Sequence, residues 1–228
     1  GLQVGSGTTI TLQQDKTISG NLALAAVASY IELNNYQLTV TGTVTGGGST
    51  SYIRTAGTGA LVLENVGVSG KLFPVGHSRY NPVLIEKGNG HHWSVRVNDG
   101  VVPDFPYTSD GAVLLTWVIQ PSVNPPIGGA DITFQFDQLN QTGSLFNTTP
   151  YEQEPVQAWH RHNGYWLSAA VPQPLVNAGG DTRTVKISGL TRFSAYGLSR
   201  ISLPLPVRLI SFQATTATDE KSSLEWRI

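Results

Sequence analysis

Residues 31–40 read Ile-Glu-Leu-Asn-Asn-Tyr-Gln-Leu-Thr-Val, two short apolar-polar-apolar triplets separated by a polar turn. The pattern recurs at intervals of roughly 22 to 28 residues: Val4 precedes Ile10-Thr11-Leu12, Leu33 precedes Leu38-Thr39-Val40, and Ile53 precedes Leu61-Val62-Leu63. Repeats of this length stack their short strands on the corresponding strands of the next repeat. We therefore predict a short β-solenoid over residues 1–70, for which an ordinary β-meander with uneven loops is the alternative.

From about Lys71 the chain becomes richer in aromatic, charged and proline residues. No segment shows sustained helical periodicity, whereas strand-like alternation is common, as in Thr9–Leu12, Gln37–Val40, Trp93–Val97, Asp131–Phe136 and Thr184–Ile187. About seven or eight strands at this spacing predict a β-sandwich of the Ig-like or jelly-roll type over residues 71–202. The turn Phe73-Pro74-Val75-Gly76 is the predicted junction, with Phe73 buried over the last solenoid coil. The predicted fold class is all-β.

Residues 203–228 form the third predicted part. Leu203-Pro204-Leu205-Pro206 reads as a stiff linker, and Val207–Ala214 and Ser223–Ile228 read as a pair of strands. This pair either opens a further domain or is a donor segment that completes a neighbouring copy by β-strand addition, which would build a head-to-tail filament. The candidate assembly residues are Val207, Leu209, Ile210, Phe212, Leu224, Trp226 and Ile228.

The composition argues against several classes of function. Charged residues make up 13% of the chain and the formal net charge is −1, so no long-range field attracts nucleic acid. Cys is absent, which excludes disulfides, thiolate metal sites and a cysteine nucleophile. The longest apolar runs, Leu22–Val27 and Ala112–Ile119, are far shorter than the roughly 20 residues that span a bilayer. We therefore expect neither nucleic-acid partners nor membrane insertion.

Two pairs of histidines are candidates for metal binding. His160 and His162 would share one face of a strand, a geometry that can hold a metal, but Arg161 lies between them and no nearby carboxylate completes a site. His91 and His92 are adjacent, so on a regular strand they face opposite ways. An exposed strand that leads into the hairpin turn is the simpler interpretation of the first pair. We expect no metal site.

Carboxylates are the other route to catalysis, because glycoside hydrolysis requires two of them at a fixed separation. The candidate aspartates are Asp99, Asp104, Asp110, Asp131 and Asp137. Most of them lie beside Gly or Pro, where Asp chiefly forms turns. The sequence contains no nucleophile elbow, P-loop, dinucleotide fingerprint or zinc-protease motif. These features predict a protein that is not an enzyme and needs no cofactor.

Aromatic residues suggest an alternative function. Several could stack on pyranose faces: Trp93, Tyr107, Trp159, Tyr165 and Trp166. We interpret Trp93, Trp117 and Trp159 as core residues, because a sandwich needs such bulk. Tyr165 and Trp166, which follow a Gly turn, are the candidate ligand platform. The alternative is therefore a carbohydrate-binding module of a secreted polysaccharide-degrading protein, with glycans as partners.

The sequence resembles the repetitive surface proteins of the Bacteroidota. The similarity is carried by Ile31-Glu32-Leu33-Asn34, Leu38-Thr39-Val40-Thr41-Gly42, Ser51-Tyr52-Ile53-Arg54-Thr55, Gly59-Ala60-Leu61, Phe73-Pro74-Val75-Gly76, Tyr80-Asn81-Pro82-Val83 and the tail Leu205–Phe212. The resemblance implies export by the type IX secretion pathway and a secreted or cell-surface location. It also implies a structural or adhesive module of a large surface protein, whose partners are other copies or neighbouring domains of a longer chain. The chain departs from the family pattern in that only two strands follow Leu205, without a sorting domain.

Overall fold

Short strands, most of them three to nine residues long, build the whole protein, as its alternating apolar pattern predicts. The computed structural model describes residues 1–102, 104–106, 109–123 and 128–201, together with the backbone of 211–216 and 222–227. The fold is all-β, which confirms the predicted class; the described residues include only two short 3₁₀ helices, η1 (Ser109–Gly111) and η2 (Tyr151–Gln153). No helical segment of the described residues has the length and hydropathy needed to cross a bilayer.

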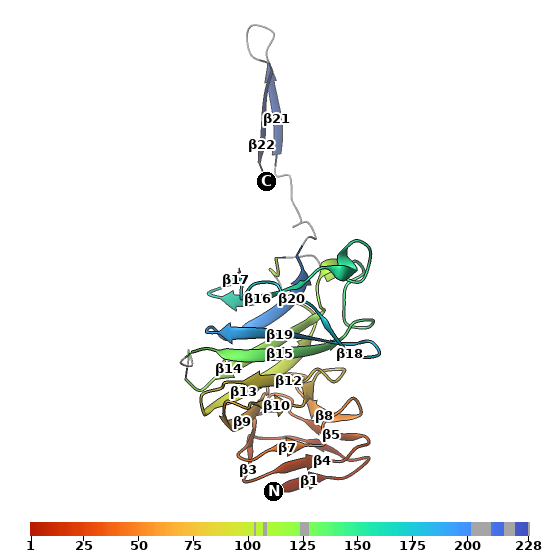
Figure 1. Ribbon diagram of the computed structural model, residues 1–228, viewed down its shortest axis with the longest axis vertical. Helices are drawn as coiled ribbons and strands as arrows, with labels where there is room; N and C mark the ends of the chain where they lie inside the picture. The colour runs from red at the N-terminus through yellow and green to blue at the C-terminus, as the bar shows by residue number, and fades with distance from the viewer. Residues whose placement is uncertain (103, 107–108, 124–127, 202–210, 217–221, 228) are drawn as a thin grey trace.

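The N-terminal part is a β-solenoid of about three coils, as predicted. Each coil contributes one short strand to each of three parallel faces. The first face holds β1 (Leu2–Val4), β4 (Leu22–Leu24) and β7 (Val44–Thr45). The second holds β2 (Thr9–Thr11), β5 (Ser29–Glu32), β8 (Ser51–Arg54) and β11 (Val75–Gly76). The third holds β3 (Lys16–Ile18), β6 (Leu38–Val40) and β9 (Leu61–Val66). These strands form the lower part of the molecule in Figure 1.

The phase of the repeat differs from the prediction. Ile10 pairs with Ile31, Ile31 with Ile53, and Ile53 with Val75, so these four residues stack inside the second face. The predicted equivalence of Ile10 and Leu38 is therefore wrong, because Leu38 pairs with Lys16. The misassignment has a physical cause: the first strand of the third face begins with a polar residue that lies at an exposed coil end, so its apolar pattern is weak.

Asx side chains tie each coil to the next at the corners. The Oδ1 atom of Asp15 accepts the backbone N–H of Gln37 at 2.9 Å, and that of Asn21 accepts the N–H of Thr43 at 3.0 Å. In both pairs the partners are 22 residues apart, which is the length of one coil. Short polar side chains satisfy backbone donors that a turn would otherwise leave unpaired. The polar corners therefore help to fix the coil length, together with the apolar ladders.

The C-terminal part is a sandwich of two sheets. One is an eight-stranded sheet in the order β17-β16-β20-β14-β13-β9-β6-β3, to which the sandwich contributes β13 (His91–Asp99), β14 (Leu115–Pro121), β16 (Val156–His162), β17 (Tyr165–Ser168) and β20 (Ala195–Arg200). The facing sheet has five strands in the order β10-β12-β15-β19-β18: β10 (Lys71–Phe73), β12 (Val83–Glu86), β15 (Ala130–Asp137), β19 (Thr182–Leu190) and β18 (Val176–Gly179). Antiparallel pairing of β9 with β13 makes the third solenoid face continuous with the sandwich (Figure 1).

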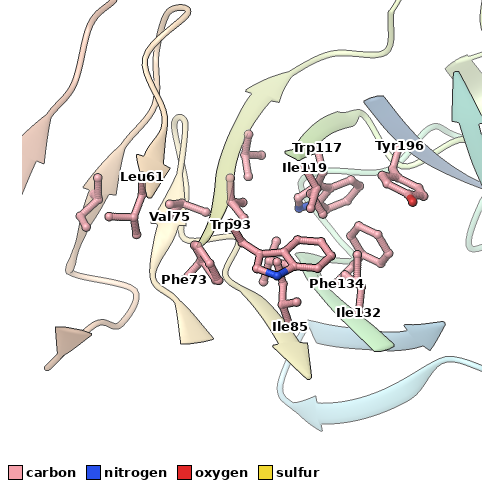
Figure 2. Packing of buried hydrophobic residues seen from close by; sticks show 14 of the residues in the cluster. Leu61, Phe73, Val75, Ile85, Trp93, Trp117, Ile119, Ile132, Phe134 and Tyr196 are labelled. Atoms are coloured by element: carbon pink, nitrogen blue, oxygen red, sulfur yellow. The ribbon is translucent and has the colours of Figure 1, made fainter. Parts of the chain in front are cut away.

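One apolar core runs through both parts. Phe134 lies edge-on to Trp117, with ring centroids 5.2 Å apart, and also contacts Tyr196, so the two sheets of the sandwich interlock through aromatic rings (Figure 2). Phe73 is fully buried, as predicted. It lies on β10 of the sandwich, whereas Val75, two residues later, lies on β11 at the end of the second solenoid face. The chain thus passes from a strand of the sandwich to a strand of the solenoid between Phe73 and Val75.

The C-terminal strand pair is present as predicted. The antiparallel strands β21 (Ser211–Thr216) and β22 (Ser222–Arg227) form a two-stranded sheet in which Phe212 is opposite Trp226. Four of the candidate assembly residues lie outside the described residues: Val207, Leu209, Ile210 and Ile228. Phe212, Leu224 and Trp226 lie on strands of which only the backbone is described.

Candidate functional site

Tyr165 and Trp166, the predicted ligand platform, lie on the edge strand β17. The hairpin between β16 and β17 turns at Asn163 and Gly164, whose φ angles of 49° and 84° are those of a tight two-residue turn. Tyr165 is opposite His162 and Trp166 is opposite Arg161, so successive side chains point to opposite faces of the sheet. The two rings therefore do not form one surface. Tyr165 is 74% exposed, whereas Trp166 is half-buried.

Trp166 belongs to an aromatic cluster on the outer face of the eight-stranded sheet. Its ring meets Phe105 edge-on at 5.0 Å, and Phe105 lies so close to Gly197 that a Cβ atom there would come within 2.3 Å of the ring. Trp159 is half-buried on the same face and donates its Nε1–H to Ser199 Oγ at 2.9 Å. The interpretation of Trp159 as a core residue is thus wrong, because its strand position points outward.

The other predicted core tryptophans behave as expected. Trp93 and Trp117 are fully buried between the sheets. Tyr107, which the sequence grouped with the aromatic platform, lies outside the described residues.

His160 and His162 share one face of β16, as their spacing predicts, and their rings stack 6.1 Å apart. His160 is buried, and its Nε2 atom lies 3.0 Å from Ser194 Oγ. Burial, followed by the electrostatic effect of His162, lowers the pKa of His160 below its ordinary value. Among the described residues, no group of three or more His, Cys, Asp or Glu side chains is arranged to hold a metal ion.

His91 and His92 lie at a bulge at the start of β13. The register with β9 shifts between His91 and Trp93, which is the irregularity that would allow the two histidines to approach one another. Instead, His92 Nδ1 lies 3.5 Å from Glu64 Oε1, and His91 Nε2 lies 3.4 Å from Asn89 Nδ2. Both rings therefore have separate polar neighbours on the surface.

The candidate aspartates are engaged in structural contacts. Asp137 accepts the N–H groups of Leu139 and Asn140 at 2.9 and 3.0 Å, as an Asx turn does. Asp110 accepts from Ser144 Oγ at 3.0 Å. Asp104 lies 3.7 Å from Arg161 in an ion pair. At Asp99 the contact is made by the backbone and not by the carboxylate: its N–H donates to His77 Nδ1 at 2.9 Å.

Asp131 is the buried member of this group. Burial alone would raise its pKa, but the hydrogen bonds from Lys87 and from the Gly189 N–H, together with the charge of Lys186, outweigh burial and lower it. Lys87 Nζ lies 2.9 Å and Lys186 Nζ lies 3.6 Å from Asp131 Oδ2. A carboxylate held ionised between two lysines is not poised to donate a proton. This cluster is therefore suited to joining β12, β15 and β19 rather than to catalysis.

A row of three tyrosine rings beside the second solenoid face was not predicted from the sequence. Tyr30, Tyr52 and Tyr80 follow one another with ring centroids 5.3 and 5.9 Å apart. The Arg54 guanidinium lies 3.7 Å above the ring of Tyr30 and binds Glu32 Oε1 at 2.8 Å. The correct coil length would have revealed the first two rings of this row, because Tyr30 and Tyr52 are directly paired between β5 and β8.

The first coil presents an open end. Strands β1, β2 and β3 are each the edge strand of their sheet, so one side of each backbone has no strand partner among the described residues. A mostly apolar hollow of about 390 Å³ lies there, lined in part by Leu2, Ile10, Leu12, Ile18 and Leu38. Unpaired strand edges beside apolar side chains are a template for the addition of further strands.

Comparison with protein-family models, curated protein sequences and solved structures finds no match.

Proposed function

We propose that this protein is a non-enzymatic structural or adhesive module of a large bacterial surface protein. The observation that carries the proposal is the continuous eight-stranded sheet, which runs from β3 in the first coil to β17 at the far edge of the sandwich. A single sheet and a shared core resist bending at the junction far better than a flexible linker does. A stiff element of this kind is suited to spacing or displaying other domains outside the cell.

The buried junction supports the same role. Thr55, which follows β8, accepts the backbone N–H of Val97 at 2.9 Å and donates its hydroxyl to the Val97 carbonyl at 2.7 Å. This threonine side chain therefore acts as an extra strand partner between the solenoid and β13. Both bonds are buried, so loosening the junction would leave polar groups unpaired.

The partners in this proposal are neighbouring domains of a longer chain or other copies of the protein. The open strand edges of β1, β2 and β3 offer a surface on which a further coil or a donor strand can pair. The sequence resemblance adds an export route, the type IX secretion pathway, and a location that is secreted or on the cell surface.

The absence of native cysteines allows a direct test of stiffness. Spin labels on the exposed residues Gln14 and Asp181, introduced as cysteines, would report the distance between the first coil and the sandwich. We expect a distance distribution as narrow as that of a control pair placed within the sandwich, at Asp181 and Gln120. A distribution much broader than the control would indicate a hinge and contradict a rigid spacer.

The location is tested on intact cells of the producing bacterium. Protease added outside the cells should degrade the protein, and a strain that lacks type IX secretion should retain it inside. Protection from external protease in cells with a working pathway would contradict the proposed surface location.

A further inference from the structure

A second kind of site lies at the edge of the sandwich, between its two sheets. A cavity of about 290 Å³ opens there, and its lining is mostly polar. Strands β16 and β17 provide one wall, and the end of β19 with the loop that follows provides the other; the lining residues are His160, Leu167, Ser168, Ala169, Gly189, Leu190, Thr191 and Arg192. The volume is at the lower end of the roughly 300–1,000 Å³ typical of ligand sites, so it suits one small unit of a larger ligand.

The charge of this cavity is positive. Arg192 carries a permanent charge, and in the described part of the chain no carboxylate makes an ion pair with it. The lining contains no Asp or Glu. His160 contributes a polar imidazole, and His162 stacks beside it. A permanent cation in a polar lining that contains no acid favours an anionic group.

The histidine in the wall is held in place. Its Nε2 atom lies 3.0 Å from Ser194 Oγ, and Ser194 also donates a hydrogen bond to the Arg161 carbonyl. On the other side, the rings of His160 and Tyr196 lie 5.4 Å apart. Preorganised polar groups lose little conformational entropy when a ligand binds. The wall that His160 forms is therefore rigid and keeps its shape when a ligand enters the cavity.

Hydroxyl groups and an exposed ring complete the surroundings. Thr191 and Ser168 line the cavity, so it offers the donors and acceptors that a polyhydroxylated ligand requires. Leu167, which lines the cavity, is opposite His160, and Tyr165 is opposite His162 on the same face of the hairpin. The ring of Tyr165 therefore lies on the cavity side of β17, and it is 74% exposed. An exposed aromatic ring beside a polar cavity provides an apolar surface for the face of a sugar ring.

We propose that this edge of the sandwich binds an acidic carbohydrate, with the carboxylate of a uronic acid unit in the cavity at Arg192 and a sugar ring against Tyr165. Thr191 and Ser168 bind the hydroxyl groups of the same unit, and His160 forms the fixed wall behind it. Trp166 takes no part, because it lies on the opposite face. This activity goes beyond the spacer role and is independent of it, since a stiff module with or without a glycan site satisfies the first proposal.

Calorimetric titration of the full 228-residue chain tests the proposal. The probes are a galacturonic acid trimer, the neutral galactose trimer and sodium sulfate. We expect the acidic trimer to bind and the neutral trimer to bind at least about tenfold more weakly, since one charge-assisted contact is lost. Equal binding of both trimers, or no binding of the acidic trimer up to about 10 mM, where even the weak contacts of a single-unit site should register, would overturn the proposal.

Two substitutions separate the parts of the site. Arg192→Gln should weaken binding of the acidic trimer at least about tenfold, and Tyr165→Ala should weaken it without changing any response to sulfate. Both side chains are exposed, so both variants should melt as the parent does. Lys16→Gln, an exposed cation on the first coil, is the matched control and should leave binding unchanged. If sulfate binds as tightly as the acidic trimer and Tyr165→Ala has no effect, the cavity binds free anions and the carbohydrate proposal fails.

Discussion

Asn81 and Gln141 exchange two hydrogen bonds in the interior of the protein. Asn81 Nδ2 donates to Gln141 Oε1 at 2.7 Å, and Gln141 Nε2 donates to Asn81 Oδ1 at 3.0 Å. The Asp137 backbone N–H also donates to Gln141 Oε1, at 3.0 Å. The loop that follows β11 is thereby fixed to the turn that follows β15. This contact gives Asn81 a structural role.

Replacing one member of this pair should lower the free energy of unfolding by more than the small size of the side chain suggests. Asn81→Ala removes the acceptor of the buried Gln141 Nε2 group, while Gln141 Oε1 keeps its bond from the Asp137 N–H. We expect the free energy of unfolding to fall by about 1–3 kcal/mol. Urea denaturation measures this change. The double variant Asn81→Ala/Gln141→Ala should lose less than the sum of the two single variants, because the second substitution removes the unpaired group. Simple additivity would show that the two amides do not depend on one another.

The second prediction of stability concerns Phe73. It is fully buried where the solenoid meets the sandwich, whereas its neighbour Leu72 is 45% exposed. Phe73→Ala should lower the free energy of unfolding by about 3–5 kcal/mol, because it opens a cavity in the shared core. Leu72→Ala, the matched control, should cost well under half of that. Similar losses for the two variants would mean that Phe73 does not close the core.

The sequence was sufficient for elements whose pattern is local. Alternation located β13 and β15, and the Asn163-Gly164 pair located a hairpin, because each signal is contained within a few residues. The predicted phase of the repeat is wrong at Lys16, because an exposed end strand does not need the apolar residue that marks the other coils. The phase of the repeat is defined by contacts between coils, and these contacts join residues about one repeat apart in the chain.

The candidate sites depended on contacts of still longer range. Asn81 and Gln141 are 60 positions apart in the chain, and His160 meets Ser194 across 34 positions. No local pattern predicts such pairs, since they follow from how the two sheets face each other. The spacing of His160 and His162 did predict that they share a face, but not that the wall opposite would carry Arg192.

His160 should make stability depend on pH in a defined window. Burial, then His162, lower its pKa below the ordinary value of 6.5; Arg192 acts in the same direction. The unfolded chain therefore takes up a proton at a higher pH than the folded protein, so this part of the stability is present above pH 6.5 and is lost as the pH falls below it. We expect the melting temperature to fall between about pH 7 and pH 5. His160→Gln should flatten this slope, whereas His91→Gln should not. An unchanged slope in the first variant would assign the effect to other groups.

Removal of metal ions should leave the protein unchanged. No group of three or more metal-ligating side chains comes together in the part of the chain that the structure describes, and the sequence predicts no cofactor. We expect the same melting temperature with and without EDTA. A drop of several degrees, restored by adding back a divalent cation, would reveal a site that includes residues beyond those described.

The final prediction concerns assembly of the chain with itself. Strands β21 and β22 form a sheet of their own, and a lone hairpin is marginally stable in water. Among the described strands, β1, β2 and β3 each have one unpaired edge beside an apolar hollow, so a hairpin strand of one copy has a receiving surface on the next. A contact of this kind is head-to-tail and does not close on itself unless a ring forms. We therefore expect fibres or rings at high protein concentration in electron micrographs.

Variants at the donor end and at the receiving end of this contact test the filament hypothesis. Deleting residues 205–228 should abolish fibres while the melting transition of the remaining chain persists, because β21 and β22 share no sheet with the other described strands. Leu2→Lys should act in the same way from the receiving end, since Leu2 lines the apolar hollow and a charge there opposes docking. Val27→Lys, at a side chain that is 61% exposed and not part of that lining, is the control and should assemble as the parent does. A parent chain that sediments as a monomer at every concentration would end the filament hypothesis, and it would leave the spacer role to neighbouring domains of a longer chain.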